Sequence, residues 1–510
     1  MSARIARISF VLCLLAAVML VAPAAYAAAP PVSLVAHLTA SDGGPDEYFG
    51  FPVAISGDTM VIGAAWDDDG AVNTGSVYVF TRTAGVWTQT VKLHASDAAA
   101  NDIFGARVAI DGGTIAVSAY DADPRGSNSG AVYIFTRSTA GVWSQQAKVT
   151  ASDETTSDEF GRSVSLSGDT LVVASPYADP MGSESGAAYI FKRSTTGVWS
   201  QQAKLTGSDE ATSDQFGGSV WLSNGTVVAG STGGDGLAAG SGAAYVFTVS
   251  ATGVWSQQAK LTASDGAADD QFGESVSLSG DTAVVGAPSD DDAGASSGSA
   301  YVFTRSAGAW SQKAKLTASD AAAGDGFGKW SIAIRDDIIL AGAYEDDDMG
   351  VDSGSAYVFQ RSMGVWSQLA KITALDGSAN DHFGAMVAAS ADTLVLSADL
   401  DTTPAGVAAG SVYVYSLAVP TSITIQTNAT TSRIGGIPIL SGLVTPSSLV
   451  GKNIVVYVRK PGKAYWTYSS NRTVYSRYGI PSWQYKYYFK PGMAKGIYVY
   501  KAFVPTMPGL

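Results

Sequence analysis

The sequence predicts an all-β protein in which a seven-bladed β-propeller, closed by an N-terminal strand, is followed by a small β-sandwich. Three observations lead to this fold class. The dipeptide Phe-Gly recurs seven times at steps of 55 or 56 residues, four short strand signals accompany the copies, and the charge of the chain changes sign near residue 421. Such a regular period indicates one supersecondary unit that is copied and stacked. The phenylalanines are Phe49, Phe104, Phe160, Phe216, Phe272, Phe327 and Phe383.

The N-terminal residues 1–27 predict a secretory signal peptide. Arg4 and Arg7 precede an apolar stretch over residues 8–21, and Ala25-Tyr26-Ala27 supplies a small-x-small cleavage pattern. Cys13 is the only cysteine and lies inside this segment, so the mature chain is expected to lack disulfides. We therefore expect a secreted, extracellular protein without a transmembrane segment, either in solution or associated with the cell surface.

The fifth repeat gives the clearest reading of one unit. Val276 and Leu278 alternate with serines, as in a half-buried strand. The apolar residues 283–288 predict a second strand, residues 299–303 a third, and residues 314–317, after Trp310, a fourth. Turn-forming residues separate these segments. Four short strands in about 55 residues are typical of one propeller blade.

The fourth-strand pattern is present before the first repeat and absent from the last repeat. One copy, near Leu38, precedes the first Phe-Gly, and the seventh repeat has no fourth strand of its own. We expect residues 35–39 to complete the seventh blade, so that the ring has no free edge between blades. The propeller is expected to span residues 33–418.

The repeats resemble a known family. Phe272-Gly273 followed by Val285-Gly286-Ala287-Pro288 is similar to the FG-GAP repeat of the integrin α-chain propeller. The resemblance covers residues 33–418 and implies a seven-bladed propeller with a role in extracellular recognition or adhesion. Calcium-binding members carry an Asp-x-Asp-x-Asp-Gly loop between the first two strands, but here residues 56–59 and 279–282 read Ser-Gly-Asp-Thr. This turn is too short to supply the oxygen ligands that calcium needs, so the metal sites of the family are not expected.

The next loop along each repeat is acidic in several copies. Its carboxylates and glycines could hold Ca²⁺, and no other cofactor is expected. The alternative is a solvated loop in which Asp serves turn formation and solubility, since the copies in repeats three and four are less acidic. The candidate calcium ligands are Asp67, Asp69, Asp290, Asp292, Asp346 and Asp348.

Two further features recur in the repeats and have simple structural interpretations. A pair of acidic residues five positions apart, such as Asp265 and Asp270, occurs in all seven copies, as expected for a loop whose Asp accepts backbone N–H groups. A catalytic pair would instead be unique to one repeat. A row of tryptophans could bind sugars, but packing between blades explains it more simply. The row comprises Trp87, Trp143, Trp199, Trp255, Trp310 and Trp366.

The two positions after each Phe-Gly differ between repeats. If they begin the innermost strands, their side chains surround one mouth of the central channel and are candidates for ligand contacts. Random drift at exposed positions would give the same pattern. The candidates are Arg107, Arg162, Glu274, Lys329 and Trp330.

Residues 421–510 form a segment of different character. It holds eleven Lys and Arg and no acidic residue, whereas all 45 acidic residues precede it. Residues 454–458 and 464–468 predict one β-hairpin, and residues 483–500 a second that turns at Lys490-Pro491-Gly492. The segment resembles the small immunoglobulin-like domains of bacterial surface proteins. Its charge and tyrosines suit an anionic cell-wall polymer or acidic polysaccharide; docking on the acidic propeller, or a spacer, is the alternative.

No enzymatic motif is recognised in the chain. The three histidines are substitutions within the repeats, and no nucleophile elbow, phosphate loop or zinc pair is present. We interpret the protein as a monomeric, non-enzymatic binding or adhesion protein whose propeller recognises an extracellular protein or glycan. The acidic repeats argue against a nucleic-acid partner. The alternatives are an extracellular polysaccharide-acting enzyme with its site at the channel mouth, and a structural spacer.

Overall fold

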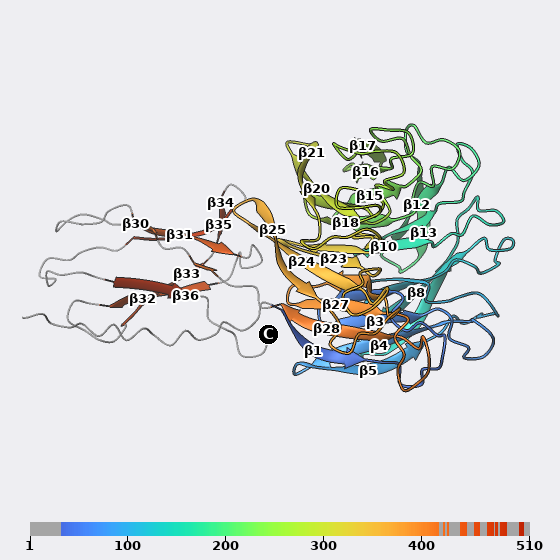
Figure 1. Ribbon diagram of the computed structural model, residues 1–510, viewed down its shortest axis with the longest axis horizontal. Helices are drawn as coiled ribbons and strands as arrows, with labels where there is room; N and C mark the ends of the chain where they lie inside the picture. Colours follow the sequence, from blue (N-terminus) through green and yellow to red (C-terminus); the bar gives the residue numbers. More distant parts are fainter. Residues whose placement is uncertain are drawn as a thin grey trace, which may run out of the picture.

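The computed structural model describes residues 32–417 in full and, beyond them, the backbone of eight short strands between residues 422 and 503. The predicted signal peptide lies outside the described residues. Residues 32–417 form seven four-stranded antiparallel sheets arranged around a common channel (Figure 1). Within the described residues every regular secondary-structure element is a β-strand, and the prediction of an all-β seven-bladed propeller is confirmed.

The innermost strands line the channel. They contact one another in sequence order around the ring, and the last also contacts the first, which closes the circle. These strands are β2 (Val53–Ser56), β6 (Arg107–Asp111), β10 (Ser163–Ser167), β14 (Val220–Ser223), β18 (Val276–Ser279), β22 (Ile332–Arg335) and β26 (Phe383–Ala389).

The second and third strands of each blade form the core. Their apolar residues are buried on both faces of the sheet, because the neighbouring blades cover both sides, and the strands therefore read as continuous apolar runs. The second strands are β3 (Thr59–Ala64), β7 (Thr114–Ala119), β11 (Thr170–Ser175), β15 (Thr226–Ser231), β19 (Thr282–Ala287), β23 (Ile338–Ala343) and β27 (Thr393–Ala398). The third strands are β4 (Ser76–Thr83), β8 (Ala131–Arg137), β12 (Ala187–Arg193), β16 (Ala243–Val249), β20 (Ser299–Ser306), β24 (Ser355–Ser362) and β28 (Ser411–Leu417).

The outermost strands alternate between buried and exposed residues, as expected at the rim of the ring. In the fifth blade this strand begins at Ala309 and not, as predicted, near Ala314, because the strand continues through a β-bulge opposite Val302 and Phe303. The outer strands are β5 (Val86–Leu93), β9 (Trp143–Val149), β13 (Trp199–Leu205), β17 (Trp255–Leu261), β21 (Ala309–Leu316), β25 (Val365–Ile372) and β1 (Val32–Leu38).

The seventh sheet contains strands from both ends of the repeat region. Strand β1 pairs antiparallel with β28, from Val32 opposite Leu417 to Leu38 opposite Val412. The sheet order is therefore β1-β28-β27-β26. This pairing covers the outer edge of β28 with hydrogen bonds from a strand that lies more than 370 residues earlier in the chain.

The C-terminal strands belong to two separate sheets. Strand β32 (Asn453–Arg459) pairs with β33 (Thr467–Thr473), as the first predicted hairpin requires. The second predicted hairpin is wrong: β35 (Ile480–Lys486) pairs with β31 (Ile439–Thr445) and β34 (Tyr475–Arg477), whereas β36 (Val499–Phe503) pairs with β32. The short strands β29 (Ser422–Ile423) and β30 (Gln426–Thr427) also pair with β31. The immunoglobulin-like packing of this segment stays a prediction.

Candidate functional site

The Phe-Gly motif joins neighbouring blades. The ring of Phe272 is fully buried and packs edge-on against Tyr301 and Phe303, with centroids 5.5 and 6.0 Å away. The glycine acts through its backbone: a Cβ atom placed on Gly286 would lie 2.3 Å from the carbonyl oxygen of Gly328, the Phe-Gly glycine of the next blade. The two blades therefore approach too closely for a side chain, and the role of the motif is structural.

The second carboxylate of each repeated pair organises a loop. Asp270 Oδ2 accepts a hydrogen bond from the backbone N–H of Ala267 at 2.7 Å. This confirms the prediction that the second acidic residue serves the loop backbone. The same contact joins Ala99 to Asp102, Thr155 to Asp158, Ala211 to Asp214, Ala322 to Asp325 and Ser378 to Asp381.

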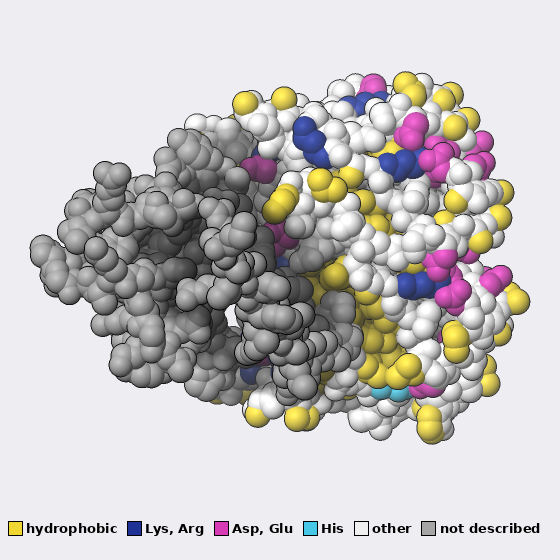
Figure 2. Space-filling view, turned by 60° about the vertical axis from the view of Figure 1, so that its left-hand side comes forward, with side chains coloured by type: hydrophobic (Ala, Val, Ile, Leu, Met, Phe, Trp, Pro, Cys, Tyr) yellow, Lys and Arg dark blue, Asp and Glu magenta, His cyan; other side chains and the backbone are white. Residues whose placement is uncertain are grey.

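The first carboxylate of each pair binds a lysine of the outer strand. Lys260 Nζ lies 2.6 Å from Asp209 Oδ2 and 5.3 Å from the ring centroid of Tyr245. Figure 2 shows such groups of basic and acidic side chains side by side at several places on the propeller. These lysines were not among the residues predicted from the sequence, although they recur with the period of the Phe-Gly motif. The pairs are Asp42–Lys92, Asp97–Lys148, Asp153–Lys204, Asp209–Lys260, Asp265–Lys315 and Asp320–Lys371.

In three blades the lysine lies among the carboxylates that were proposed as calcium ligands. Lys315 Nζ is 2.9 Å from Asp265, 2.8 Å from Asp290 and in contact with Asp292. Burial opposes the charge of Lys315, but the hydrogen bonds that it donates to Asp290 and Asp292 outweigh burial and raise the pKa of the lysine. The group therefore stays protonated and supplies a cation from within the chain.

In three blades an ammonium group lies between these carboxylates and offsets one of the three negative charges that would attract a metal. Calcium binding by these loops stays a prediction. Within the described residues, no cluster of three or more His, Cys, Asp and Glu is suited to hold a metal ion. The six candidate ligands surround lysines as follows: Asp67 and Asp69 contact Lys92, Asp290 and Asp292 contact Lys315, and Asp346 and Asp348 contact Lys371.

The seventh blade has a histidine in place of the lysine. His37 of β1 stacks on Tyr413 with ring centroids 4.2 Å apart. Its two ring nitrogens lie 3.8 Å from Asp376 and 3.8 Å from Asp401. Burial raises the pKa of Asp401, but the nearby His37 and Ser411 side chains lower it further than burial raises it. The carboxylates of the seventh blade therefore lie farther from their basic partner than the 2.6–2.9 Å of the Lys–Asp pairs in the other six blades.

The row of tryptophans packs between blades, as predicted. Trp310 lies against the core cluster shared by blades four and five. Its indole N–H donates to Gln258 Oε1 at 3.0 Å, and the Arg305 guanidinium lies 5.3 Å from its ring. All six members of the row belong to such clusters: Trp87, Trp143, Trp199, Trp255, Trp310 and Trp366.

The structure brings the five candidate ligand contacts to one end of the channel, where the innermost strands begin. Arg107 is the first residue of β6, and Arg162, Glu274 and Trp330 lie one or two residues before their strands. Burial raises the pKa of Glu274, while the charges of Lys329, Arg107 and Arg162 act in the opposite direction. The four charged groups are therefore close enough to interact across the ring.

Aromatic side chains link blades across this end of the channel. Trp330 of blade six meets Phe51 of blade one, with ring centroids 5.4 Å apart, although blade seven separates the two in the ring order. The Arg107 guanidinium lies 5.2 Å from the same Phe51 ring, and Trp330 stacks on Tyr344 at 4.2 Å. We call these seven residues the Phe-Gly mouth: Phe51, Arg107, Arg162, Glu274, Lys329, Trp330 and Tyr344. Phe51 and Tyr344 were not among the sequence candidates.

Two cations of the Phe-Gly mouth, Lys329 and Arg162, have carboxylate partners and aromatic neighbours. Lys329 Nζ lies 2.9 Å from Glu345 Oε1 and 5.2 Å from the Tyr344 ring. Arg162 lies 3.4 Å from Glu159. Trp330 remains 37% exposed despite its stacking. Exposed aromatic faces with charged edges can bind a ligand by stacking and by charge-assisted hydrogen bonds.

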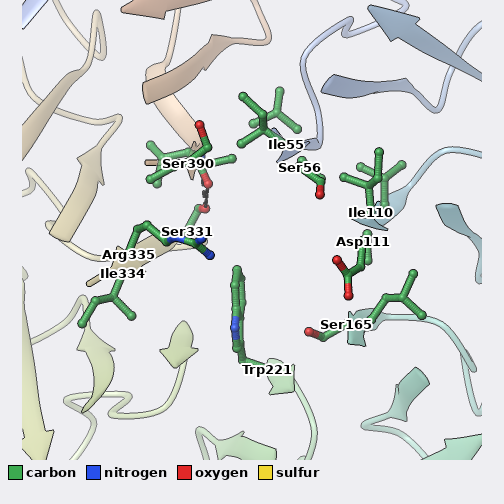
Figure 3. Close-up of a pocket in the computed structure, with 18 of the residues that line it drawn as sticks. Ile55, Ser56, Ile110, Asp111, Ser165, Trp221, Ser331, Ile334, Arg335 and Ser390 are labelled. Atoms are coloured by element: carbon green, nitrogen blue, oxygen red, sulfur yellow. Dashed lines mark hydrogen bonds between the residues drawn. The ribbon is translucent and has the colours of Figure 1, made fainter. Parts of the chain in front are cut away.

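The channel beyond the Phe-Gly mouth contains a cavity of about 1130 Å³. Trp221, Arg335 and Asp111 point into it from three different blades (Figure 3). These residues were not among the candidates predicted from the sequence, which came only from the two positions after Phe-Gly and not from the rest of the innermost strands.

Seven four-stranded sheets around a channel, with one polar and aromatic mouth, define the class of the protein as a seven-bladed β-propeller. Comparison with protein families is more specific: the family described as FG-GAP repeat matches residues 32–80, 87–135, 143–191, 199–247, 255–303, 310–359 and 366–415. Because the matches cover more than half of the chain, the protein belongs to the FG-GAP repeat family. Comparison with curated proteins gave no match. Among the described residues, no helix is long and apolar enough to span a membrane.

Glu210→Gln is expected to stabilise the protein at alkaline pH. Burial raises the pKa of Glu210 from 4.5 to about 7, although Tyr245 and Ser231 hydrogen-bond to it. The folded chain therefore binds this proton more tightly than the unfolded chain does. The contribution of the protonated Glu210 to the free energy of unfolding is fully present below pH 4.5 and is lost as the pH rises to about 7. Urea unfolding should show a gain of up to about 3 kcal/mol for Glu210→Gln at pH 8 and little change at pH 4.

The neighbouring Asp209→Asn is the control with the opposite sign. Burial opposes the charge of Asp209, but hydrogen bonds from Lys260 and Tyr245 lower its pKa. Its contribution is therefore present above its unfolded pKa and is lost as the pH falls. Asp209→Asn should weaken the protein at pH 8 and have little effect at low pH. A loss of stability at pH 8 in Glu210→Gln would contradict the buried position of Glu210.

Proposed function

We propose that the protein is a secreted, non-enzymatic binding or adhesion protein whose propeller recognises an extracellular protein or glycan through the Phe-Gly mouth. Membership of the FG-GAP repeat family is compatible with such a role. The closed ring of blades provides a rigid frame on which a few side chains can be held in fixed positions.

The observation that carries this proposal is the separation of repeated from non-repeated residues. The repeated carboxylates, lysines and tryptophans are occupied by structural contacts: the lysines bind carboxylates, other carboxylates accept backbone N–H groups, and the tryptophans pack between blades. The residues that differ between blades meet at one end of the channel, where aromatic faces and charges are partly exposed. A recognition site needs this asymmetry, because a seven-fold ring of identical residues would bind a ligand equally well in seven orientations.

Secretion and surface attachment form the second part of the proposal. The features of residues 1–27 support export, and the eleven basic residues after position 421 support association with an anionic cell-surface polymer. In this view the C-terminal segment keeps the protein at the surface and the propeller presents the Phe-Gly mouth. Such electrostatic attachment should weaken at high salt.

The test is co-sedimentation of the mature chain with cell envelopes from the source organism, together with a glycan array. The variants carry residues that other blades have at the same position: Arg162→Ala, Lys329→Ala and Trp330→Ser. We expect the triple variant to lose about tenfold or more in affinity at physiological salt, because exposed aromatic and basic residues dominate most binding surfaces. The matched control, Lys313→Gln, removes a rim charge in favour of the glutamine found at positions 146, 202 and 258.

Two outcomes would contradict the proposal. If the triple variant and the Lys313→Gln control bind equally well, recognition does not involve the Phe-Gly mouth. If the wild-type chain binds neither envelopes nor any glycan or extracellular protein, a purely structural role as a spacer gains support.

One observation favours an enzyme as the second candidate. Glu274 is a half-buried carboxyl group with a raised pKa at the mouth of a channel, and a raised pKa is a property of a general acid in polysaccharide cleavage. Turnover of an extracellular polysaccharide that Glu274→Gln abolishes, with ligand binding retained, would favour this function over simple recognition.

A further inference from the structure

Two residues of the innermost strands depart from the pattern of the repeat. Trp221 pairs with Val228 of the second strand, and the residues at the same register in the other six blades are small. Arg335 pairs with Ile338, at a register where other blades carry serine or aspartate. The small residues in register with Trp221 are Ala54, Ala109, Ser165, Ser277, Ala333 and Ala388.

The side chains of Trp221 and Arg335 both point into the channel cavity. The indole of Trp221 and the guanidinium of Arg335 extend into the channel cavity from β14 and β22, and Asp111 faces them from β6 (Figure 3). The cavity, of about 1130 Å³, is large enough for a small ligand of the size that protein pockets commonly bind. It reaches the turns that follow the innermost strands, so Asp111 and Arg335, the last residues of β6 and β22, lie at the end opposite the Phe-Gly mouth, and Trp221 lies midway along the channel.

Most other polar groups on these strands already have structural partners. Serine hydroxyls accept hydrogen bonds from backbone N–H groups of the next blade: Ser165 accepts one from Leu222 at 3.0 Å, and Ser277 accepts one from Ile334 at 3.1 Å. Asp111 uses one oxygen in the same way, accepting from Gly168 at 2.7 Å. Its second oxygen has no hydrogen bond within the described residues.

The polar groups of Trp221 and Arg335 lack such hydrogen-bond partners within the described residues. The indole is half-buried against the core of the fifth blade, and its N–H makes no hydrogen bond within the described part of the chain. The side chain of Arg335 is 57% exposed, and its closest carboxylate in that part, Asp336, is 3.9 Å away. An aromatic face, a guanidinium with open donors and a carboxylate oxygen therefore meet in one cavity.

We propose that this cavity binds an acidic saccharide, such as a uronate unit of an extracellular glycan. The indole of Trp221 stacks against the C–H face of the sugar ring, as aromatic side chains do with apolar surfaces. The Arg335 guanidinium pairs with the sugar carboxylate, and Asp111 accepts a hydrogen bond from a hydroxyl group. A single guanidinium matches a singly charged carboxylate, whereas Asp111 would repel the double charge of a phosphate monoester.

The site is distinct from the Phe-Gly mouth, and its existence does not depend on the proposed function. Arg107 and Trp330 mark one end of the lining, and Asp111 and Arg335 mark the other ends of the same strands, β6 and β22. A ligand could therefore occupy the cavity whether or not a partner binds at the mouth.

The test is isothermal titration calorimetry of the mature full-length chain with digalacturonate and, as the neutral probe, cellobiose. The variants Trp221→Ser and Arg335→Ser restore residues that other blades carry at these positions, so both should fold, as circular dichroism and the melting temperature can verify. We expect digalacturonate to bind the wild type and Trp221→Ser to weaken binding by about tenfold or more. Arg335→Ser should abolish the preference for digalacturonate over cellobiose.

The control is Lys313→Gln on the exposed outer strand of the fifth blade, which should leave digalacturonate binding unchanged, and Arg162→Ala reports separately on the Phe-Gly mouth. The proposal is overturned if the wild type fails to bind digalacturonate, or if folded Trp221→Ser and Arg335→Ser bind it as the wild type does. Equal binding of digalacturonate and cellobiose by the wild type would reject the acidic class of ligand. Loss of binding in Arg162→Ala, with both channel variants unaffected, would move the saccharide to the mouth and support the proposed function instead.

Discussion

Phe272→Ala is expected to lower the free energy of unfolding by about 3–5 kcal/mol, the usual cost of emptying a buried aromatic site. The side chain of Phe272 is fully buried, and its cluster joins Val228 and Val246 of blade four to Val285 and Tyr301 of its own blade. The surrounding strands belong to two sheets that are fixed by their own hydrogen bonds, so they can relax little into the cavity. Urea unfolding, followed by circular dichroism, measures the loss.

The control for this prediction is Leu375→Ala, because the leucine is 83% exposed and its truncation removes almost no buried surface. It should change stability by less than about 0.5 kcal/mol. A Phe272→Ala variant as stable as Leu375→Ala would contradict the interpretation of Phe-Gly as the main contact between blades. It would then leave the recurrence of phenylalanine at all seven positions without a structural reason.

The fold could be predicted because the same pattern of strands occurs in seven copies along the chain. Phenylalanine at steps of 55 or 56 residues must occupy the same position in each unit, and the flanking alternation of small and apolar residues fixes the strands. The tryptophan row and the second carboxylate of each pair were predictable for the same reason: their chemistry needs only local packing and local backbone N–H groups.

The lysine clusters were harder to predict because their partners are distant in sequence. Lys92 lies 50 residues after Asp42: the aspartate is in the loop that follows β1, and the lysine is in β5, whose register includes a β-bulge. Without the bulge, the side chains beyond it would point to the opposite face of the sheet. The periodic lysines were nevertheless visible in the sequence, and pairing them with the periodic aspartates would have argued against calcium at once.

The channel residues illustrate the opposite signal, a departure from the repeat. Trp221 and Arg335 occupy registers where other blades carry mostly small residues, and such a departure is informative only when the register is known. Pairing errors in the C-terminal segment have a related cause. Without a repeat to align, β35 and β36 looked like one hairpin, although the structure pairs them with different neighbours.

Gly342→Ala is expected to cost about 3 kcal/mol, near the upper end of the range for overpacked sites. A Cβ atom on Gly342 of β23 would lie 1.9 Å from the carbonyl oxygen of Gly384, the Phe-Gly glycine of blade seven. Because that oxygen belongs to the backbone, no side-chain rotation relieves the clash, and the sixth and seventh blades must move apart. Thermal and urea unfolding should show the loss, with the largest change in the region that closes the ring.

Gly308→Ala provides the matched control for Gly342→Ala. Gly308 has a φ of +81° and no atom within 4 Å of an added Cβ, so alanine there meets conformational strain without a clash and should cost about 1 kcal/mol. Gly342 has the reverse situation, since its φ lies outside the left-handed region. Without the clash, alanine would stabilise this position by restricting the unfolded chain. The sign of the change in stability therefore tests whether the clash exists. A Gly342→Ala variant that is more stable than the wild type would mean that adjacent blades can separate at no cost. Close backbone contact would then not be the reason for the glycine in the second strand.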